Sequence, residues 1–261
     1  MSFGIATTAI IPMRDQAQHQ SEMVSQILFG EMMSIIDVDE EWSKVKLDFD
    51  GTEGWIPNGM FQTIEANDYN NLKSSKTIIL DAISDIQIGN ASNTMRVMHG
   101  SEIHNNGQQA NQMIVGNQLF SLKHRASMPI RGNIRHAVIS KVMEYLNAPY
   151  LWGGRSVFGI DCSAFTQMVF KQNNITLPRE VKDQFSVGRI IKDIDQSMPG
   201  DIAFMANENG QICHVGIVVE PYKIIHADDF IRFATVIDKK ICNFDTNKSK
   251  YSLAYIRNII D

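Results

Sequence analysis

One stretch in the second half of the chain constrains the fold more than any other. It begins with residues 149–154, a loop of glycine and aromatic residues, and continues through Cys162 into a run with helical periodicity. Within that run, Met168 and Val169 follow Phe165 by three and four residues. This spacing predicts a helix packed against a core, with Cys162 in its first turn.

A cysteine at the start of a helix has a chemical consequence. The unpaired amides and the dipole of a helix N-terminus favour negative charge, so they lower the pKa of a thiol placed there. Because the thiolate is the nucleophile, Cys162 is a candidate catalytic residue. The alternative is that Cys162 is a small buried hydrophobic residue, which is the commoner role of a free cysteine.

A nucleophilic thiol needs a base within hydrogen-bond reach, and His214 is the candidate. It lies in residues 212–219, a run rich in β-branched residues that predicts a strand. With the two-residue period of a strand, His214 and Gly216 share one face, while Cys213 points to the other. We therefore expect Cys213 to belong to the core.

A second histidine follows on the next predicted strand. Residues 222–227 come after a tight connection and are expected to run antiparallel to the strand of His214. Pairing of the two strands can bring His226 beside His214, where it would orient the base. The sequence thus predicts a site in which Cys162, His214 and His226 act in series.

A metal site is the alternative use of these side chains, and we do not favour it. The chain has no paired-cysteine spacing, and the strand period separates Cys213 from His214. An odd count of three cysteines also argues against a disulfide framework, and Cys242 is expected to be structural. We expect no metal and no cofactor.

The composition is that of an ordinary soluble globular protein. A length of 261 residues favours two or three domains. The net charge of −5 gives no reason to expect nucleic acid or a membrane as a partner. The sequence shows no signal peptide and no apolar span long enough to cross a bilayer, so a cytoplasmic location is the default expectation, although a chain trimmed of its leader would look the same.

The first half of the chain alternates short β-type runs with turns, which is typical of small barrels. The strands expected in residues 1–66 are residues 5–12, 23–29, 31–37, 42–47 and 54–57. A polar linker is expected at residues 67–75. A second, more divergent barrel is expected up to residue 127, with strands at residues 77–83, 93–98, 101–104 and 116–120 and a turn at residues 105–107.

The pattern changes from residue 128 onward. Ile134, Val138 and Val142 have helical spacing, so a helix is expected before the loop that leads to Cys162. The order is then helix, loop, helix and several antiparallel strands, the last near residues 253–256. This is an α+β arrangement, in which helices pack on an antiparallel sheet.

Six pieces of the second half match a known pattern: residues 149–154, 161–163, 177–179, 199–204, 214–217 and 225–227. Together they resemble the NlpC family of papain-like cysteine peptidases, which cut bacterial cell-wall peptides. Residues 32–36, 42–46 and 54–57 resemble a bacterial SH3-like domain. The resemblance implies an SH3-like domain at residues 1–66, a second one at residues 67–127, and a papain-like peptidase domain at residues 128–261.

The resemblance implies hydrolysis of the bond between γ-D-Glu and a diamino acid in peptidoglycan stem peptides with a free N-terminal L-Ala, in cell-wall turnover or murein peptide recycling. Cys162 would attack, His214 would transfer the proton, and His226 would orient His214. The hydroxyl of Tyr150 and the backbone amide of Cys162 would stabilise the oxyanion. An amidase or acyltransferase reaction at the same site, or a non-catalytic wall-binding protein, are the alternatives.

The resemblance also implies which residues bind the substrate. Asp161 and Ser163 would hold its ammonium group and backbone, although Asp161 has the equally good alternative of capping the helix. Arg179 and Glu180 would complete the pocket, but related sequences often have aspartate where this chain has Glu180. Trp152 would line the cleft or pack under the loop.

Overall fold

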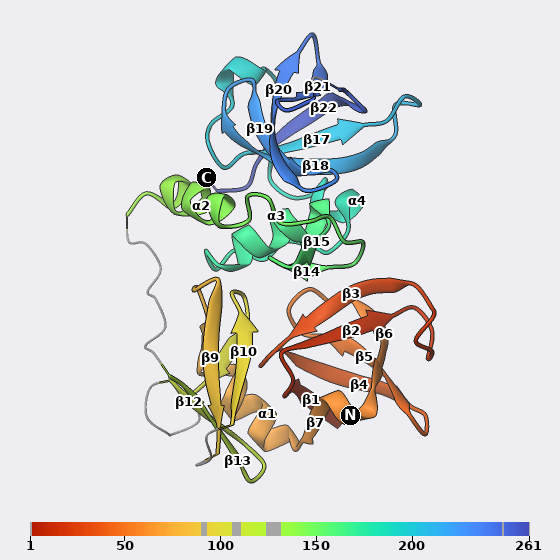
Figure 1. The fold of residues 1–261 in the computed structure, drawn as a ribbon, viewed down its shortest axis with the longest axis vertical. Coiled ribbons are helices and arrows are strands. Elements are labelled where there is room, and N and C mark those ends of the chain that lie inside the picture. Colours follow the sequence, from red (N-terminus) through yellow and green to blue (C-terminus); the bar gives the residue numbers. More distant parts are fainter. Residues whose placement is uncertain (1, 90–92, 106–110, 124–131, 247, 261) are drawn as a thin grey trace. The chain divides into compact units, whose positions relative to one another are not determined.

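The computed structural model describes residues 2–89, 93–105, 111–123, 132–246 and 248–260 (Figure 1). The chain divides into two compact units, residues 1–128 and residues 129–261. The second unit begins one residue after the predicted start of the peptidase domain. Division of the first unit into two domains stays a prediction.

The first unit contains a seven-stranded antiparallel sheet with the strand order β3-β2-β6-β5-β4-β1-β7. Its strands are β1 (Ser2–Ala6), β2 (Ile10–Arg14), β3 (Met23–Leu28), β4 (Met32–Val38), β5 (Trp42–Leu47), β6 (Glu53–Pro57) and β7 (Phe61–Ile64). A short 3-10 helix, η1 (Asn58–Met60), joins the last two. A core of fully buried side chains, among them Ile11, Val45 and Ile56, lies against these strands.

The prediction of a single strand over residues 5–12 is wrong. The chain leaves the sheet after Ala6 and returns to it at Ile10. β1 pairs with β4 and β7, whereas β2 pairs with β3 and β6, so the two halves of the predicted strand lie at different places in the sheet. The Thr8 hydroxyl donates to the Met60 carbonyl at 3.2 Å and holds the connection between β1 and β2 in place.

The prediction of a linker at residues 67–75 is also wrong. Helix α1 (Ala66–Lys73) occupies this stretch and buries Tyr69 and Leu72. The Tyr69 ring stacks on Phe3 with the centroids 4.0 Å apart. The stretch is rich in asparagine and charged residues, and two apolar side chains are too few to predict a helix from their spacing.

The rest of the first unit consists of two smaller sheets. Their strands are β8 (Lys76–Ile78), β9 (Ile83–Ile88), β10 (Thr94–Met98), β11 (Glu102–His104), β12 (Gln112–Val115) and β13 (Gln118–Leu122). β10, β9, β13 and β12 form one sheet, and β11 pairs with β8 in the other. Ile86 and Phe120 share one core with Ile5 of the first sheet and with Phe29, in the turn after β3. The turn predicted at residues 105–107 lies largely outside the described residues.

The second unit is an antiparallel sheet with helices. Its helices are α2 (Ile134–Glu144), α3 (Cys162–Lys171), α4 (Val181–Gln184) and the 3-10 helix η2 (Ile194–Gln196). Its strands are β14 (Arg155–Ser156), β15 (Gly159–Ile160), β16 (Arg189–Ile191), β17 (Ile202–Ala206), β18 (Ile212–Glu220), β19 (Lys223–Ala227), β20 (Ile231–Ile237), β21 (Lys240–Asn243) and β22 (Tyr251–Asn258). The order β16-β22-β17-β18-β19-β20-β21, with a further pairing of β22 to β21, closes six of these strands into a ring.

Helix α3 is the centre of the second unit and begins at Cys162, as predicted. Phe165, Met168 and Val169 are fully buried, as their spacing indicates. α3 packs against β18 and β19, and the Tyr145 ring at the end of α2 meets Phe165 edge-on at 5.6 Å. Figure 1 shows α2 and α3 together on one side of the sheet. The α+β class predicted for this half of the chain is confirmed.

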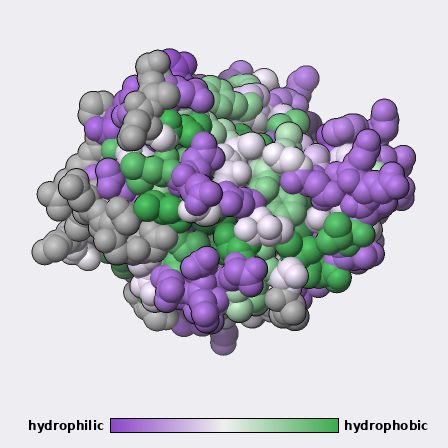
Figure 2. Space-filling view, turned by 90° about the horizontal axis from the view of Figure 1, so that it is seen from below, coloured by the Kyte–Doolittle hydropathy of each residue, from purple (hydrophilic) through white to green (hydrophobic). Residues whose placement is uncertain are grey.

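The surface is mixed in character. The face drawn in Figure 2 interleaves hydrophilic and hydrophobic residues. Within the part of the chain that the structure describes, no helix has the length and apolar character needed to span a bilayer.

Candidate active site

Asp161 fixes the start of the helix that presents Cys162. Its carboxylate accepts from the Ala164 amide at 2.8 Å and from the Gly153 amide at 3.0 Å. The first bond is a helix N-cap, so the capping interpretation of Asp161 is confirmed. The second bond ties the glycine-rich loop to the same carboxylate, which places Cys162 at the junction of loop and helix.

Arg179 completes a buried cluster around that carboxylate. Its guanidinium donates to both oxygens of Asp161, at 3.1 Å to Oδ1 and through a shorter bond to Oδ2. It also donates to Ser163 Oγ at 2.8 Å, and Ser163 donates to Asp161 at 3.1 Å. Asp161, Ser163 and Arg179, three of the residues predicted to bind substrate, therefore contact one another. The positive charge of Arg179 offsets the negative charge of Asp161.

Gln184 is a further residue of this region that the sequence did not indicate. Its side-chain amide donates to the carbonyls of Ser163 at 2.9 Å and Pro178 at 2.8 Å, and it accepts from the Thr166 hydroxyl at 2.7 Å. Gln184 is fully buried. It joins α4 to the first turn of α3 and so stiffens the segment that carries Cys162.

The two histidines meet across the pair of strands as expected. β18 and β19 run antiparallel with Gly216 opposite His226. His214 Nε2 and His226 Nδ1 lie 2.9 Å apart, and both residues are buried. A side chain at Gly216 would put its Cβ within 2.9 Å of the His226 Cβ, so glycine leaves the room that His226 needs.

The Cys162 sulfur lies on the β18 side of α3. The backbone amides of Val215, which follows His214, and of Ser163 both hydrogen-bond the sulfur and favour its thiolate. The contact with His226 involves Nε2 of His214 and not Nδ1. Cys162 keeps 7 % of its surface exposed. This arrangement suits a nucleophile served by a neighbouring base.

Burial shifts the pKa values of Cys162 and His214 toward their uncharged forms. Burial raises the pKa of the Cys162 thiol to about 12, and the Asp161 carboxylate adds to the rise. Burial also lowers the pKa of His214 to about 3, with His226 contributing. The predicted lowering of the cysteine pKa is therefore wrong in direction, because desolvation outweighs the helix N-terminus. Proton transfer from sulfur to imidazole still adds no net charge to the site.

Tyr150 lies near Cys162 and Asp161. Its backbone amide donates to the Asp229 carbonyl at 3.0 Å, which fastens the loop to the segment after β19. Burial raises the pKa of Tyr150, and the nearby Cys162 and Asp161 raise it further. The phenol therefore keeps its proton at neutral pH and can donate a hydrogen bond.

Tyr251, the first residue of β22, packs against the ring of His214. The two rings are stacked with centroids 4.4 Å apart and an angle of 8° between their planes. Residue 251 lies far from residue 214 in sequence, and the contact forms because β22 pairs with β17, the neighbour of β18. The sequence offered no pattern that points to Tyr251.

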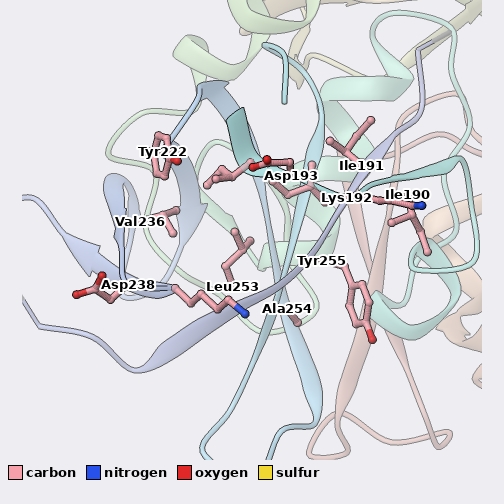
Figure 3. Close-up of a pocket in the computed structure, with 13 residues that line it drawn as sticks. Ile190, Ile191, Lys192, Asp193, Tyr222, Val236, Asp238, Leu253, Ala254 and Tyr255 are labelled. Atoms are coloured by element: carbon pink, nitrogen blue, oxygen red, sulfur yellow. The ribbon is translucent and has the colours of Figure 1, made fainter. Parts of the chain in front are cut away.

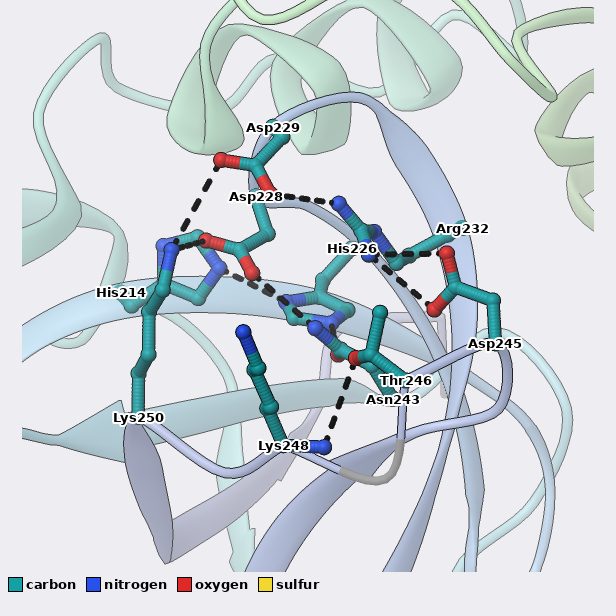
Figure 4. A network of polar contacts seen from close by, with 10 residues as sticks. All are labelled: His214, His226, Asp228, Asp229, Arg232, Asn243, Asp245, Thr246, Lys248 and Lys250. Atoms are coloured by element: carbon teal, nitrogen blue, oxygen red, sulfur yellow. Dashed lines mark hydrogen bonds and ion pairs between the residues drawn. The ribbon is translucent and has the colours of Figure 1, made fainter.

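A line of polar residues continues beyond the histidines (Figure 4). His226 Nε2 lies 2.9 Å from Asn243 Oδ1, and Asn243 Nδ2 donates to Asp228 Oδ2 at 3.0 Å. Lys250 Nζ donates to Asp228 Oδ1 at 2.9 Å. Asn243, Asp228 and Lys250 were not predicted. The position of Asp228 two residues after His226 was the one local hint.

Other predicted residues lie at the surface. Glu180 is exposed at the start of α4, and Trp152 is 61 % exposed, so it is not packed under the loop. Cys213 points away from His214, as predicted, but it is exposed and not in the core, because that face of β18 is open at this end. Cys242 is half-buried. The substrate roles of Glu180 and Trp152 stay predictions.

A separate pocket of about 570 Å³ lies on the second unit (Figure 3). Its lining includes Ile190, Asp193, Tyr222 and Tyr255, and it contains none of the predicted site residues. Among the described residues, no group of three or more histidine, cysteine, aspartate or glutamate side chains is placed to hold a metal ion.

Comparison with known proteins supports the two resemblances. Residues 147–243 match the NlpC/P60 family, and residues 13–59 match the bacterial dipeptidyl-peptidase SH3 domain. The chain shares its fold with a solved NlpC/P60 family protein from Bacillus cereus, with a TM-score of 0.79 over 100 % of both chains at 17 % identity.

Two curated relatives have the name γ-D-glutamyl-L-lysine dipeptidyl-peptidase. The one from Bacillus subtilis is 36 % identical over 107 residues, which is 38 % of this chain and 36 % of the relative. The one from Bacillus cereus is 23 % identical over 243 residues, which is 83 % of this chain and 71 % of the relative. The chain thus matches about a third of the first relative and most of the second.

Proposed function

Because its second unit belongs to the NlpC/P60 family, a family of cysteine peptidases, we propose that this chain hydrolyses the γ-D-glutamyl-L-diamino acid bond of peptidoglycan stem peptides. The observation that carries the proposal is the 2.9 Å contact of His214 with His226, beside a cysteine at the start of a buried helix. A thiol, a base and an orienting group in series are the requirements for acyl transfer.

The proposed reaction proceeds in two stages. The proton of the Cys162 thiol passes to His214, and the sulfur attacks the γ-carbonyl of D-Glu to form a tetrahedral oxyanion. The Tyr150 hydroxyl and the Cys162 amide donate hydrogen bonds to that oxyanion. His214 then protonates the leaving amine, which yields a thioester. A water molecule activated by His214 hydrolyses the thioester and restores the thiol.

The proposed substrate has L-Ala-γ-D-Glu ahead of the bond that is cut. Two relatives are named for cleavage after γ-D-glutamate, which supports this class of peptide. We assign the free ammonium of L-Ala to the region of Asp161 and Ser163. Because Arg179 already neutralises Asp161, the carboxylate would attract the ammonium less strongly than an unpaired one, and Ser163 Oγ would share the contact.

The first unit has the supporting role in this proposal. Its bacterial SH3 domain would bind the peptide or the wall fragment. We include residues 67–127 in it as a second, divergent SH3-like barrel. The short antiparallel strands β9 to β13 support this interpretation. The proposed setting is cell-wall turnover or the recycling of murein peptides.

The proposal is tested with defined peptides and mass spectrometry. The full chain is incubated with L-Ala-γ-D-Glu-L-Lys, with the diaminopimelate peptide, and with versions whose N-terminal amine is acetylated. We expect L-Ala-D-Glu as the product from the free peptides and little from the acetylated ones. Cys162→Ala should lower the rate by roughly 10⁴-fold or more. Equal cleavage of free and acetylated peptides would refute the free-amine requirement.

A further inference from the structure

We infer that Asn243, Asp228 and Lys250 form a polar relay that sets which nitrogen of His214 is the base. This inference rests on the proposed function only in calling His214 the base. The five residues Lys250, Asp228, Asn243, His226 and His214 are joined in series by contacts of 2.9 to 3.0 Å. In Figure 4, dashed lines join Lys250 to Asp228, Asp228 to Asn243, Asn243 to His226 and His226 to His214.

The relay starts from a carboxylate that can only accept. The Asp228 side chain is 6 % exposed and pairs with Lys250, whose side chain is 53 % exposed. Burial alone would raise the pKa of Asp228, but the hydrogen bonds from Lys250 and Asn243 outweigh it and leave the pKa below its ordinary value. Asp228 is therefore ionised at neutral pH and has no proton to donate.

An ionised Asp228 fixes the orientation of the Asn243 amide. The NH₂ group must face Asp228, since the opposite orientation would set two acceptor oxygens against each other. The Asn243 oxygen is then directed at His226 Nε2, at 2.9 Å. Asn243 is 5 % exposed, so water is a poor substitute for either bond.

The orientation of Asn243 decides the tautomers of both histidines. Facing an acceptor oxygen, His226 Nε2 must have the proton, so neutral His226 offers the lone pair of Nδ1. His214 Nε2 must then donate to that lone pair across 2.9 Å. Nδ1 of His214 is left without a proton, ready to accept one from Cys162. A reversed relay would put a proton on Nδ1 and block the base.

Replacing Asp228 by asparagine should reverse the relay without changing the shape of the side chain. Lys250 would hold the oxygen of the new amide, whose NH₂ group would then face Asn243 and turn it over. We expect Asp228→Asn to lower kcat by roughly ten- to hundredfold with KM unchanged. Asp245→Asn is the matched control, because Asp245 pairs with Arg232 in the same region and lies outside the relay.

The decisive variant combines Asp228→Asn with Asn243→Asp. An aspartate at position 243 accepts from both His226 Nε2 and the amide at position 228, so the original direction returns. We expect kcat to recover to within about threefold of the parent. A merely structural role for Asp228 predicts that the second change adds to the damage, and that result would overturn the inference.

A direct readout separates the relay from the proposed reaction. In the full chain labelled with ¹⁵N-histidine, long-range proton–nitrogen spectra report which nitrogen of each neutral ring has the proton, and His214→Gln identifies the signal. We expect the Nε2–H form of His214 in the parent, the Asp245→Asn control and the double variant, and the Nδ1–H form in Asp228→Asn. The same tautomer in all four would refute the relay even if the peptides are cleaved, and the expected pattern would support it even if they are not.

Discussion

Two aspartates flank the site, and each is held by a cation in a different setting. Asp161 pairs with Arg179, and the side chains of both are less than a tenth exposed. Asp228 is equally buried, but its partner Lys250 is half-exposed. The first pair lies next to Cys162, and the second is joined to His226 through Asn243. The difference is that the Asp161 pair is buried on both sides, whereas the Asp228 pair has one partner in solvent.

The physical reason lies in what replaces each cation when it is lost. Around Asp161, the amides of Gly153 and Ala164 and the Ser163 hydroxyl remain, but the carboxylate is buried, so water solvates it poorly. Lys250 stands at the surface, where water can solvate the free oxygen of Asp228. Breaking a buried pair leaves an uncompensated charge, while losing an exposed partner costs little.

Arg179→Met should have the largest effect. Removing the guanidinium leaves the buried Asp161 carboxylate unpaired, so we expect a loss of roughly 3–5 kcal/mol in the stability of the second unit. Hydrogen exchange of the α3 peptides in the full chain measures this loss. Arg179→Lys, which keeps the charge without the two-pronged geometry, should lie between the parent and Arg179→Met. Unchanged exchange in Arg179→Met would contradict the comparison.

The second largest effect is expected from acid, which should lower the stability of the second unit through His214. Burial lowers the pKa of His214 to about 3, whereas the unfolded chain binds a proton at the ordinary value of 6.5. Between these values the unfolded state binds more protons, so the free energy of unfolding should fall as the pH drops, by up to about 1.4 kcal/mol per pH unit. The burial-lowered pKa of His226 acts in the same direction.

The same exchange experiment, corrected for the intrinsic effect of pH, measures this slope from neutral to acid pH. His214→Gln removes one of the two titrating groups and should flatten the slope while leaving the Arg179 effect in place. An equal slope in the parent and in His214→Gln would show that His214 is not held neutral by burial.

Tyr251→Ala should have a smaller effect, confined to the base. The stacked ring at 4.4 Å holds His214 in its plane, and an aromatic pair of this kind is worth about 0.5–1.5 kcal/mol. We expect kcat on the peptide substrate to fall about three- to tenfold in Tyr251→Ala. Tyr251→Phe keeps the stack and should stay close to the parent, so a large loss in Tyr251→Phe would point to the hydroxyl instead.

Lys250→Met should have the smallest effect on stability. The lysine side chain is 53 % exposed, and exposed ion pairs contribute about 0–1 kcal/mol. Asp228 stays ionised without it, so the direction of the relay should persist and kcat should change little. A loss in Lys250→Met as large as that in Arg179→Met, measured by the same exchange of α3 peptides, would erase the distinction between the two pairs.

Local pattern was enough to predict the three central residues. Cys162 followed from helical spacing, and His214 and His226 followed from two strands joined by a short turn. The position of Asn243 was out of reach, because it depends on the register in which β19, β20 and β21 pair side by side. Tyr251 depends in the same way on the ring being closed by β22.

The errors have the same origin, since each arises where long-range packing overrides local composition. The polar stretch that forms α1 contains just two buried side chains among the residues of the helix. Cys213 follows the strand period correctly, but the period cannot say whether the far face of a strand is covered. The pKa of Cys162 depends on burial, which no spacing reports.

β22 has a consequence for the order in which the candidate site is assembled. β22 is synthesised after Cys162 and His214, yet it pairs with β16, β17 and β21 and supplies the ring that stacks on His214. Cys162 is therefore translated before Tyr251, whose ring stacks on His214. A nascent chain that ends before β22 would therefore contain Cys162 and His214 without the ring that stacks on His214.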